Sequence, residues 1–167
     1  MEKTDITIYT DGACTGNPGP GGYGVVILEN GKRQELSAGY RLTTNNRMEL
    51  LAVIVALGSL KQASKVKLYT DSQYVADSIN RDWAKSWRAR NWKKADRTKA
   101  LNVDLWKQAL DLLERHEVQV IWVRGHTGNR ENERCDLLAV SAANRRDLPP
   151  DSGYEQSQAV PNQAGLF

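Results

Sequence analysis

Strand-like and helix-like patterns follow one another in an order that leaves few folds open. Five segments have the pattern of strands: 5–10, 23–29, 32–42, 66–70 and 118–123. Asn30-Gly31 separates the second and third of these, and this dipeptide is typical of a tight hairpin turn. After the third strand, segments with helical periodicity alternate with the remaining strands, and Asn102 can cap the helix before the last strand. We therefore predict an α/β fold with a five-stranded mixed sheet, in which an antiparallel meander is followed by parallel strands, with helices on both faces.

Two near-repeats place acidic residues at matching positions. Ile8–Asp11 and Leu68–Asp71 each have the pattern of an apolar strand that ends in Thr-Asp. If these strands are parallel neighbours, their aspartates meet at the carboxyl edge of the sheet. Met48–Val53 and Cys135–Val140 share an acid followed by Leu-Leu-Ala-Val, and in both the acid borders the buried face of a helix. The four acids are Asp11, Glu49, Asp71 and Asp136.

Each acid taken alone has a plainer explanation. An aspartate after a strand often forms a turn, and a glutamate early in a helix complements the helix dipole. Four clustered carboxylates, however, repel one another, and burial raises that cost unless cations compensate it. Oxygen ligands of this kind suit Mg²⁺, and two such ions ~3.5–4 Å apart clamp the attacking and leaving oxygens of a phosphodiester. With only two cysteines and two histidines, the chain has no cluster that favours zinc.

The loops contribute one further titratable group. His126 lies in a polar loop between Gly125 and Gly128, where its ring can move protons or assist product release. An exposed loop histidine without a role is the alternative. Residues 11–22 are rich in Gly and Pro, so we predict a turn there. Its glycines allow another backbone to approach closely, but they do not form a phosphate-binding loop, because no Gly-Lys-Ser/Thr follows.

Residues 81–100 concentrate the positive charge. They hold eight Lys or Arg against two acids, whereas the whole chain of 167 residues has a formal net charge of +3. Trp83, Trp87 and Trp92 lie among them, and basic side chains interleaved with aromatic rings suit a nucleic-acid surface. The alternative is a solvated helix whose tryptophans dock it on the core, since Trp83 and Trp87 share one helix face.

Residues 148–167 differ from the rest in composition. They contain no Lys or Arg, but three of the five prolines and many Gln, Ser and Asn. We predict a folded domain over 1–147 and a disordered tail over 148–167. No apolar run approaches the ~20 residues of a membrane span, and no secretory signal pattern is present. Cys14 and Cys135 fit free thiols in a reducing cytoplasm. We also expect a monomer with no membrane partner.

Five motifs follow one another along the chain. They are Thr10–Gly24, Thr43–Leu50, Tyr69–Val75, Asn102–Trp106 and Gly125–Asp136. Together they resemble the bacterial type-1 ribonuclease H family over residues 4–147. The resemblance implies a ribonuclease H-like fold and an endoribonuclease that hydrolyses the RNA strand of RNA–DNA hybrids. It also implies two Mg²⁺ ions (or Mn²⁺), products with 3′-hydroxyl and 5′-phosphate ends, and roles in DNA replication and R-loop removal.

The resemblance assigns roles residue by residue. The metal-binding acids of the family fall on the same four acids that the near-repeats indicate, and its mobile-loop histidine falls on His126. Contacts to the RNA minor groove fall on Cys14, Asn17, Asn46 and Gln73. A pocket for a DNA phosphate falls on Thr44 and Asn102, and Asn45 of the same motif is a further substrate contact. The basic protrusion, about residues 81–100, is implied to grip the DNA strand through Trp83, Trp87, Arg88, Arg90, Trp92, Lys93, Lys94 and Lys99.

Other interpretations of the whole chain remain. A two-metal integrase, transposase or resolvase shares the acids but lacks the complete protrusion and hybrid-contact motifs. A catalytically silent hybrid-binding module would not need four metal-binding acids. At the end of the chain, Gln163–Phe167 resembles the Gln-x-x-Leu-Phe peptide by which bacterial replication proteins bind the sliding clamp, and an unconstrained tail is the alternative.

Overall fold

The computed structural model describes residues 4–125 and 128–165, which form one mixed sheet flanked by helices. Its strands are β1 (Thr4–Cys14), β2 (Gly19–Glu29), β3 (Lys32–Thr43), β4 (Ser64–Thr70) and β5 (Glu117–Trp122). Its helices are α1 (Asn45–Gly58), α2 (Gln73–Asn80), α3 (Trp83–Ala89), α4 (Val103–Arg115), α5 (Arg130–Ala143) and α6 (Ser152–Gly165). Within the described residues the strand order is β3-β2-β1-β4-β5.

The pairing of the strands confirms the predicted sheet. β1–β2 and β2–β3 are antiparallel, whereas β1–β4 and β4–β5 are parallel. The structure differs from the prediction beyond Asp11, where we expected a turn up to Gly22. There β1 and β2 continue to pair as far as Cys14 opposite Gly21. Glycines that are typical of turns thus lie within paired strands, where they admit closely packed helices.

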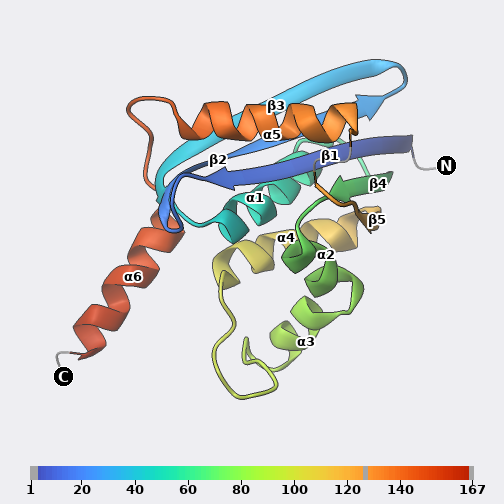
Figure 1. Ribbon diagram of the computed structural model, residues 1–167. Helices are drawn as coiled ribbons and strands as arrows, with labels where there is room; N and C mark the ends of the chain where they lie inside the picture. The colour runs from blue at the N-terminus through green and yellow to red at the C-terminus, as the bar shows by residue number, and fades with distance from the viewer. Residues whose placement is uncertain (1–3, 126–127, 166–167) are drawn as a thin grey trace.

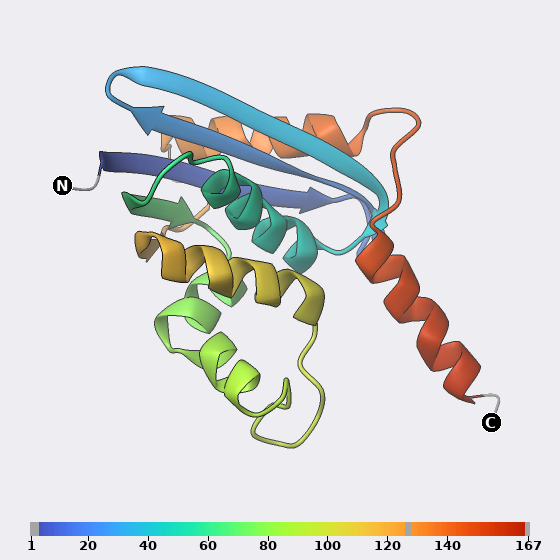
Figure 2. The same cartoon turned by 180° about the vertical axis from the view of Figure 1, so that it is seen from behind.

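The helices cover both faces of the sheet, as predicted. α1 packs on one face of β1 and β2, and α5 packs on the other (Figures 1 and 2). The core between the sheet and α1 includes Ile8, Leu50 and Leu68, which are fully buried. On the other face, a Cβ atom on Gly24 of β2 would lie 2.2 Å from a carbonyl oxygen of α5. The backbone of α5 therefore lies directly against β2, and this close contact fixes the distance between the side chains of α5 and the sheet.

The basic segment, residues 81–100, forms α3 and a loop that leads to α4. Trp87 packs edge-to-face on the fully buried Trp106, with ring centroids 6.1 Å apart. Trp92 is half-buried against the same core, whereas Trp83 is 42% exposed. The docking alternative is therefore correct for the rings of Trp87 and Trp92, and only Trp83 presents an exposed ring. Across the loop, Lys93 pairs with Lys99 in an antiparallel bridge.

The structure differs from the predicted disorder of residues 148–167, because α6 occupies most of that segment. Figure 1 shows α6 extending away from the sheet. Its start is anchored: Arg41 of β3 forms an ion pair of 2.8 Å with Glu155, and Asp151 is 8% exposed. Composition predicted disorder because the segment has no Lys or Arg and is rich in Pro, Gln, Ser and Asn, but two of its acids form ion pairs with arginines elsewhere in the fold. The last two residues of the clamp-like peptide Gln163–Phe167 lie outside the described residues, so the clamp contact stays a prediction.

None of the helices in the described ranges combines the length and the apolar character that crossing a bilayer requires.

Candidate active site

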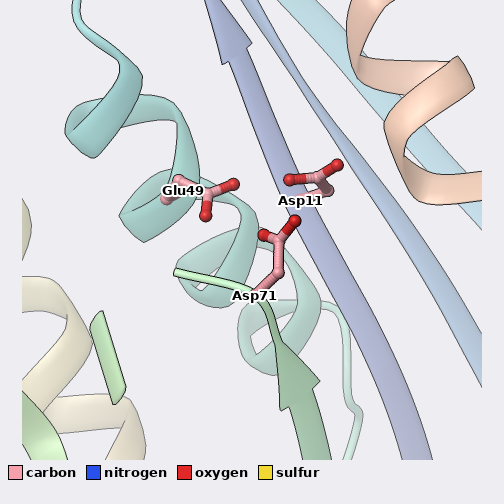
Figure 3. A group of neighbouring side chains, drawn as sticks. All are labelled: Asp11, Glu49 and Asp71. Carbon is pink, nitrogen blue, oxygen red and sulfur yellow. The ribbon is translucent and has the colours of Figure 1, made fainter. Parts of the chain in front are cut away.

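Three of the four predicted acids meet at the carboxyl edge of the sheet. Asp11 lies on β1, Asp71 directly follows the parallel strand β4, and Glu49 lies in the first turns of α1. The three side chains point toward one another (Figure 3), and their nearest carboxylate oxygens all lie within 4.8 Å. Because Thr10 pairs with Thr70 in the parallel register, the near-repeats bring Asp11 and Asp71 side by side as expected.

The backbone of Gly12 holds two of the acids in place. Its N–H donates to Oδ1 of Asp11 at 2.9 Å and also to Oε1 of Glu49. A Cβ atom at Gly12 would lie 2.4 Å from the backbone nitrogen of Glu49. Only glycine lets β1 and α1 approach to this distance. α1 itself begins here because Oγ1 of Thr44 accepts a hydrogen bond from Arg47 N and caps the helix.

The cluster is electrostatically costly in the absence of cations. Burial raises the pKa of Asp11 to about 8, and the charges of Asp71 and Asp136 add to the rise, although a hydrogen bond with Glu49 acts in the opposite direction. Burial and the charge of Asp11 also raise the pKa of Glu49 well above its usual range. These shifts mean that the folded chain resists full ionisation of the cluster near neutral pH.

The acids line an open cleft of about 330 Å³. Asp136 of α5 lines the same cleft, although it is not among the three carboxylates that lie within 4.8 Å. Three of the predicted substrate contacts also line it, namely Asn45, Asn46 and Gln73. On this concave surface the four acids can bind cations. The amides beside them can bind a linear polymer that is polar and has a charged backbone.

Other predicted contacts lie at the ends of β1, β3 and α4. The Cys14 thiol donates to the carbonyl oxygens of Gly19 and Thr43, each at 3.4 Å, so it packs as a hydrogen-bonded thiol. Asn17 accepts a hydrogen bond from the backbone N–H of Asn45 at 3.0 Å.

Asn102 directly precedes α4 and has a φ of 60°. Its side chain makes no capping bond, although we expected it to cap this helix. Its amide instead contacts Arg47 and Tyr74.

The predicted protrusion residues lie away from the acids, on α3 and the loop after it. Arg90, Lys93 and Lys99 are exposed. Lys94 is half-buried, and Arg88 forms an ion pair of 2.6 Å with Glu114. His126, the predicted proton carrier, lies outside the described residues.

Sequence analysis missed several residues at this site. Gly12, Ser72 and Tyr74 line the cleft together with the predicted residues. Arg47, which follows the predicted Asn46 directly, is a buried arginine at 3% exposure. Its place inside the motif Thr43–Leu50 is a signal that could have identified it.

The donor set fits hard divalent cations. The three clustered groups offer carboxylate oxygens, and two of the three residues are buried. Burial, together with repulsion from neighbouring acids, raises the pKa values of Asp11 and Glu49. Cations bound between such oxygens would relieve that repulsion. The nearby thiol of Cys135 donates to the carbonyl oxygen of Tyr9 at 3.2 Å, and burial raises its pKa, so it does not offer a thiolate that would favour zinc.

Comparison with known proteins gives consistent matches over most of the chain. The model of the RNase H family matches residues 3–144. A Ribonuclease H of Trichodesmium erythraeum (strain IMS101) is 62% identical over 154 residues, which cover 92% of this chain and 98% of the relative.

Solved structures are similar as well. LC9-RNase H1, described as a type 1 RNase H with the type 2 active-site motif, is 35% identical with a TM-score of 0.75, and the match covers 86% of this chain and 74% of that chain. LC11-RNase H1 in complex with an RNA/DNA hybrid is 26% identical with a TM-score of 0.62, and the match covers 83% of this chain and 96% of that chain.

Proposed function

This chain belongs to the ribonuclease H family, and from that premise we propose that it hydrolyses the RNA strand of RNA–DNA hybrids with the help of two divalent cations. One observation carries the proposal: three carboxylates from β1, α1 and the end of β4 converge in an open cleft lined by amide side chains. The name shared by the relatives supports the same class of enzyme. The RNA/DNA hybrid bound by one similar structure supports the substrate.

The acids would hold the cations, Mg²⁺ or Mn²⁺, with Asp11, Glu49 and Asp71 as the inner group and Asp136 beside them. When bound, such cations polarise a phosphodiester oxygen, promote ionisation of water and stabilise the charge of the transition state. A hydrolysis of this kind leaves 3′-hydroxyl and 5′-phosphate ends. The folded chain contributes the fixed positions of the carboxylates, so that little reorganisation is needed as the reaction proceeds.

The residues around the acids account for substrate choice. Asn46 and Gln73 line the cleft with amides that can donate to and accept from a 2′-hydroxyl, the group that distinguishes RNA from DNA. The exposed cations Lys93 and Lys99 would contact the phosphates of the DNA strand. His126 would exchange a proton through a ring nitrogen during turnover or product release.

The test is a cleavage assay on an end-labelled RNA–DNA hybrid, with single-stranded RNA, duplex RNA and duplex DNA as the other substrates. Each is incubated with Mg²⁺ or with chelator, using the wild type and the Asp11→Asn variant. Asp111→Asn on the exposed surface of α4 is the matched control.

We expect cleavage only of hybrid RNA, only with metal, and only by the wild type and the control. Hybrid binding without any cleavage would favour the silent binding module. Cleavage of duplex DNA would favour a recombinase-like enzyme.

A further inference from the structure

The buried guanidinium of Arg47 joins three separate parts of the chain. Arg47 lies in α1 directly after Asn46, which lines the cleft. Its Nη1 and Nη2 donate to the two carboxylate oxygens of Asp104 in α4, at 2.9 and 2.7 Å. Its Nε and Nη2 donate to the two oxygens of Asp151, at 2.8 and 3.0 Å. Paired forks of this kind fix the plane of a guanidinium as well as its position.

Asp151 lies beyond residue 144, where the match to the family model ends. It is 8% exposed, and it also accepts a hydrogen bond from Oγ1 of Thr43 at 2.7 Å. The N–H of Tyr154 in the first turn of α6 donates to the same carboxylate at 3.3 Å. The carboxylate therefore ties the start of α6 to the end of β3 and to α1. α6 also passes very close to the guanidinium, because a Cβ atom on Gly153 would lie 2.8 Å from Arg47 Nη2.

Arg47 also reaches toward the cleft through Asn102. Its Nη1 donates to Oδ1 of Asn102 at 3.4 Å, and Nδ2 of Asn102 donates to the hydroxyl of Tyr74 at 3.1 Å. Tyr74 lines the cleft, and its hydroxyl accepts a second hydrogen bond from Trp106 Nε1 at 2.8 Å. A guanidinium only donates, so its presence forces the amide oxygen of Asn102 toward Arg47 and the amide nitrogen toward Tyr74.

We propose that Asp151 is a positioning residue for substrate binding: through Arg47 it fixes the orientation of Asn102 and Tyr74 at the edge of the cleft. The segment after the catalytic fold thereby takes part in binding the hybrid without touching it. This inference rests on the proposed function, in which Asn102 contributes to the pocket for a phosphate of the DNA strand.

The first test separates positioning from stability. Steady-state hydrolysis of the hybrid is measured well below the melting temperature of each variant. Asp151→Asn should raise KM by about three- to tenfold with kcat little changed, because one or two hydrogen bonds that orient the binding groups are weakened. Gly153→Ala should act in the same direction, since its Cβ atom would lie 2.0 Å from Oδ2 of Asp104.

Glu155→Gln is the matched control. It removes the exposed ion pair between Arg41 and Glu155, which also anchors α6, but it does not reach Arg47. We expect it to leave both KM and kcat at wild-type values. If KM rises in this variant as much as in Asp151→Asn, the docking of α6 as a whole matters for substrate binding, and the assignment to Asp151 would be wrong.

A second readout probes the phosphate directly. Single methylphosphonates are placed in turn along the DNA strand, each of which removes one backbone charge. The position that most raises the wild-type KM should have a markedly smaller effect in Asp151→Asn, because that variant no longer presents an aligned pocket.

Two failures are distinguishable. If the wild type does not cleave hybrid, the proposed function is wrong. If it does cleave while Asp151→Asn and Gly153→Ala have lower melting temperatures but unchanged KM, the network serves stability alone and the inference is refuted.

Discussion

Replacing Asp11 by asparagine should abolish hydrolysis and at the same time stabilise the fold. The side chain is 4% exposed, and its carboxylate lies within 4.8 Å of two others. Asparagine has nearly the same shape, keeps an oxygen that can accept from the N–H of Gly12, and carries no charge. The substitution therefore removes repulsion without creating a cavity.

The magnitude follows from the pKa of Asp11, which burial and the neighbouring acids raise from 3.8 to about 8. A shift of about four units corresponds to an upper limit on the order of 5 kcal/mol at pH 8, at ~1.4 kcal/mol per unit. Burying an amide in the same place takes back part of this gain, so we expect about 1–2 kcal/mol. For a chain of this size that is a rise in Tm of roughly 2–8 °C.

The pH dependence gives the sharper test. The pKa of Asp11 is raised in the folded state, so folding favours the protonated form of this side chain. The folded wild type therefore loses stability relative to its unfolded state as pH rises from about 4 to about 8. Asparagine does not titrate, so the Tm advantage of the variant should be smallest near pH 4 and largest near pH 8. Mg²⁺ should reduce the difference in Tm between the two proteins, because it binds the folded wild type more tightly than the folded variant and so stabilises the wild type more.

Thermal unfolding of both proteins at a series of pH values, with and without Mg²⁺, measures this difference directly. Asp111→Asn controls for the loss of one negative charge elsewhere on the surface. A variant that is less stable than the wild type at pH 8 in chelator would refute the account of the cluster as a source of repulsion.

Three other changes test separate parts of the structure. Lys93→Gln with Lys94→Gln should weaken hybrid binding and reduce the slope of log K against log salt by roughly 1–2, whereas Lys107→Gln on α4 should leave the slope unchanged. His126→Ala should lower kcat by up to about 10²-fold without abolishing hydrolysis, and complete loss would assign it a different role. Gly24→Ala should lower the free energy of unfolding by more than ~1 kcal/mol in denaturant titrations, because its Cβ atom would lie 2.2 Å from a backbone carbonyl of α5; an unchanged midpoint would show that α5 can shift at little cost.

The sheet and the cluster could be predicted because both depend on local pattern. Alternation of apolar residues identifies each strand, and the near-repeats mark where two parallel strands end. Once β1 and β4 are neighbours in register, Asp11 and Asp71 must lie side by side. The family resemblance added the substrate contacts, which no periodicity indicates. The matches to ribonucleases H confirm that resemblance.

The rest could not be predicted because it depends on contacts between distant residues. Asp151 is ordered by Arg47, which lies 104 positions earlier in the chain. A polar, proline-containing segment gives no sign of such a partner. The same holds for Trp87. Its place among basic residues suggested a nucleic-acid contact, but its ring packs edge-to-face on the distant Trp106, and this packing does not favour such a contact.

The glycine-rich stretch that begins at Gly12 in β1 illustrates how the fold assembles a site that its own charges oppose. Burial and repulsion work against placing Glu49 beside Asp11, as their raised pKa values indicate. What holds them together is contact between main chains: the N–H of Gly12 donates to both carboxylates, and its missing side chain lets α1 lie directly on β1. The stretch therefore serves close packing, as its lack of a phosphate-binding pattern suggested. Because the backbone positions the acids, neutralising one of them leaves the geometry of the others in place, and so the loss of activity and the gain in stability should occur in the same variant.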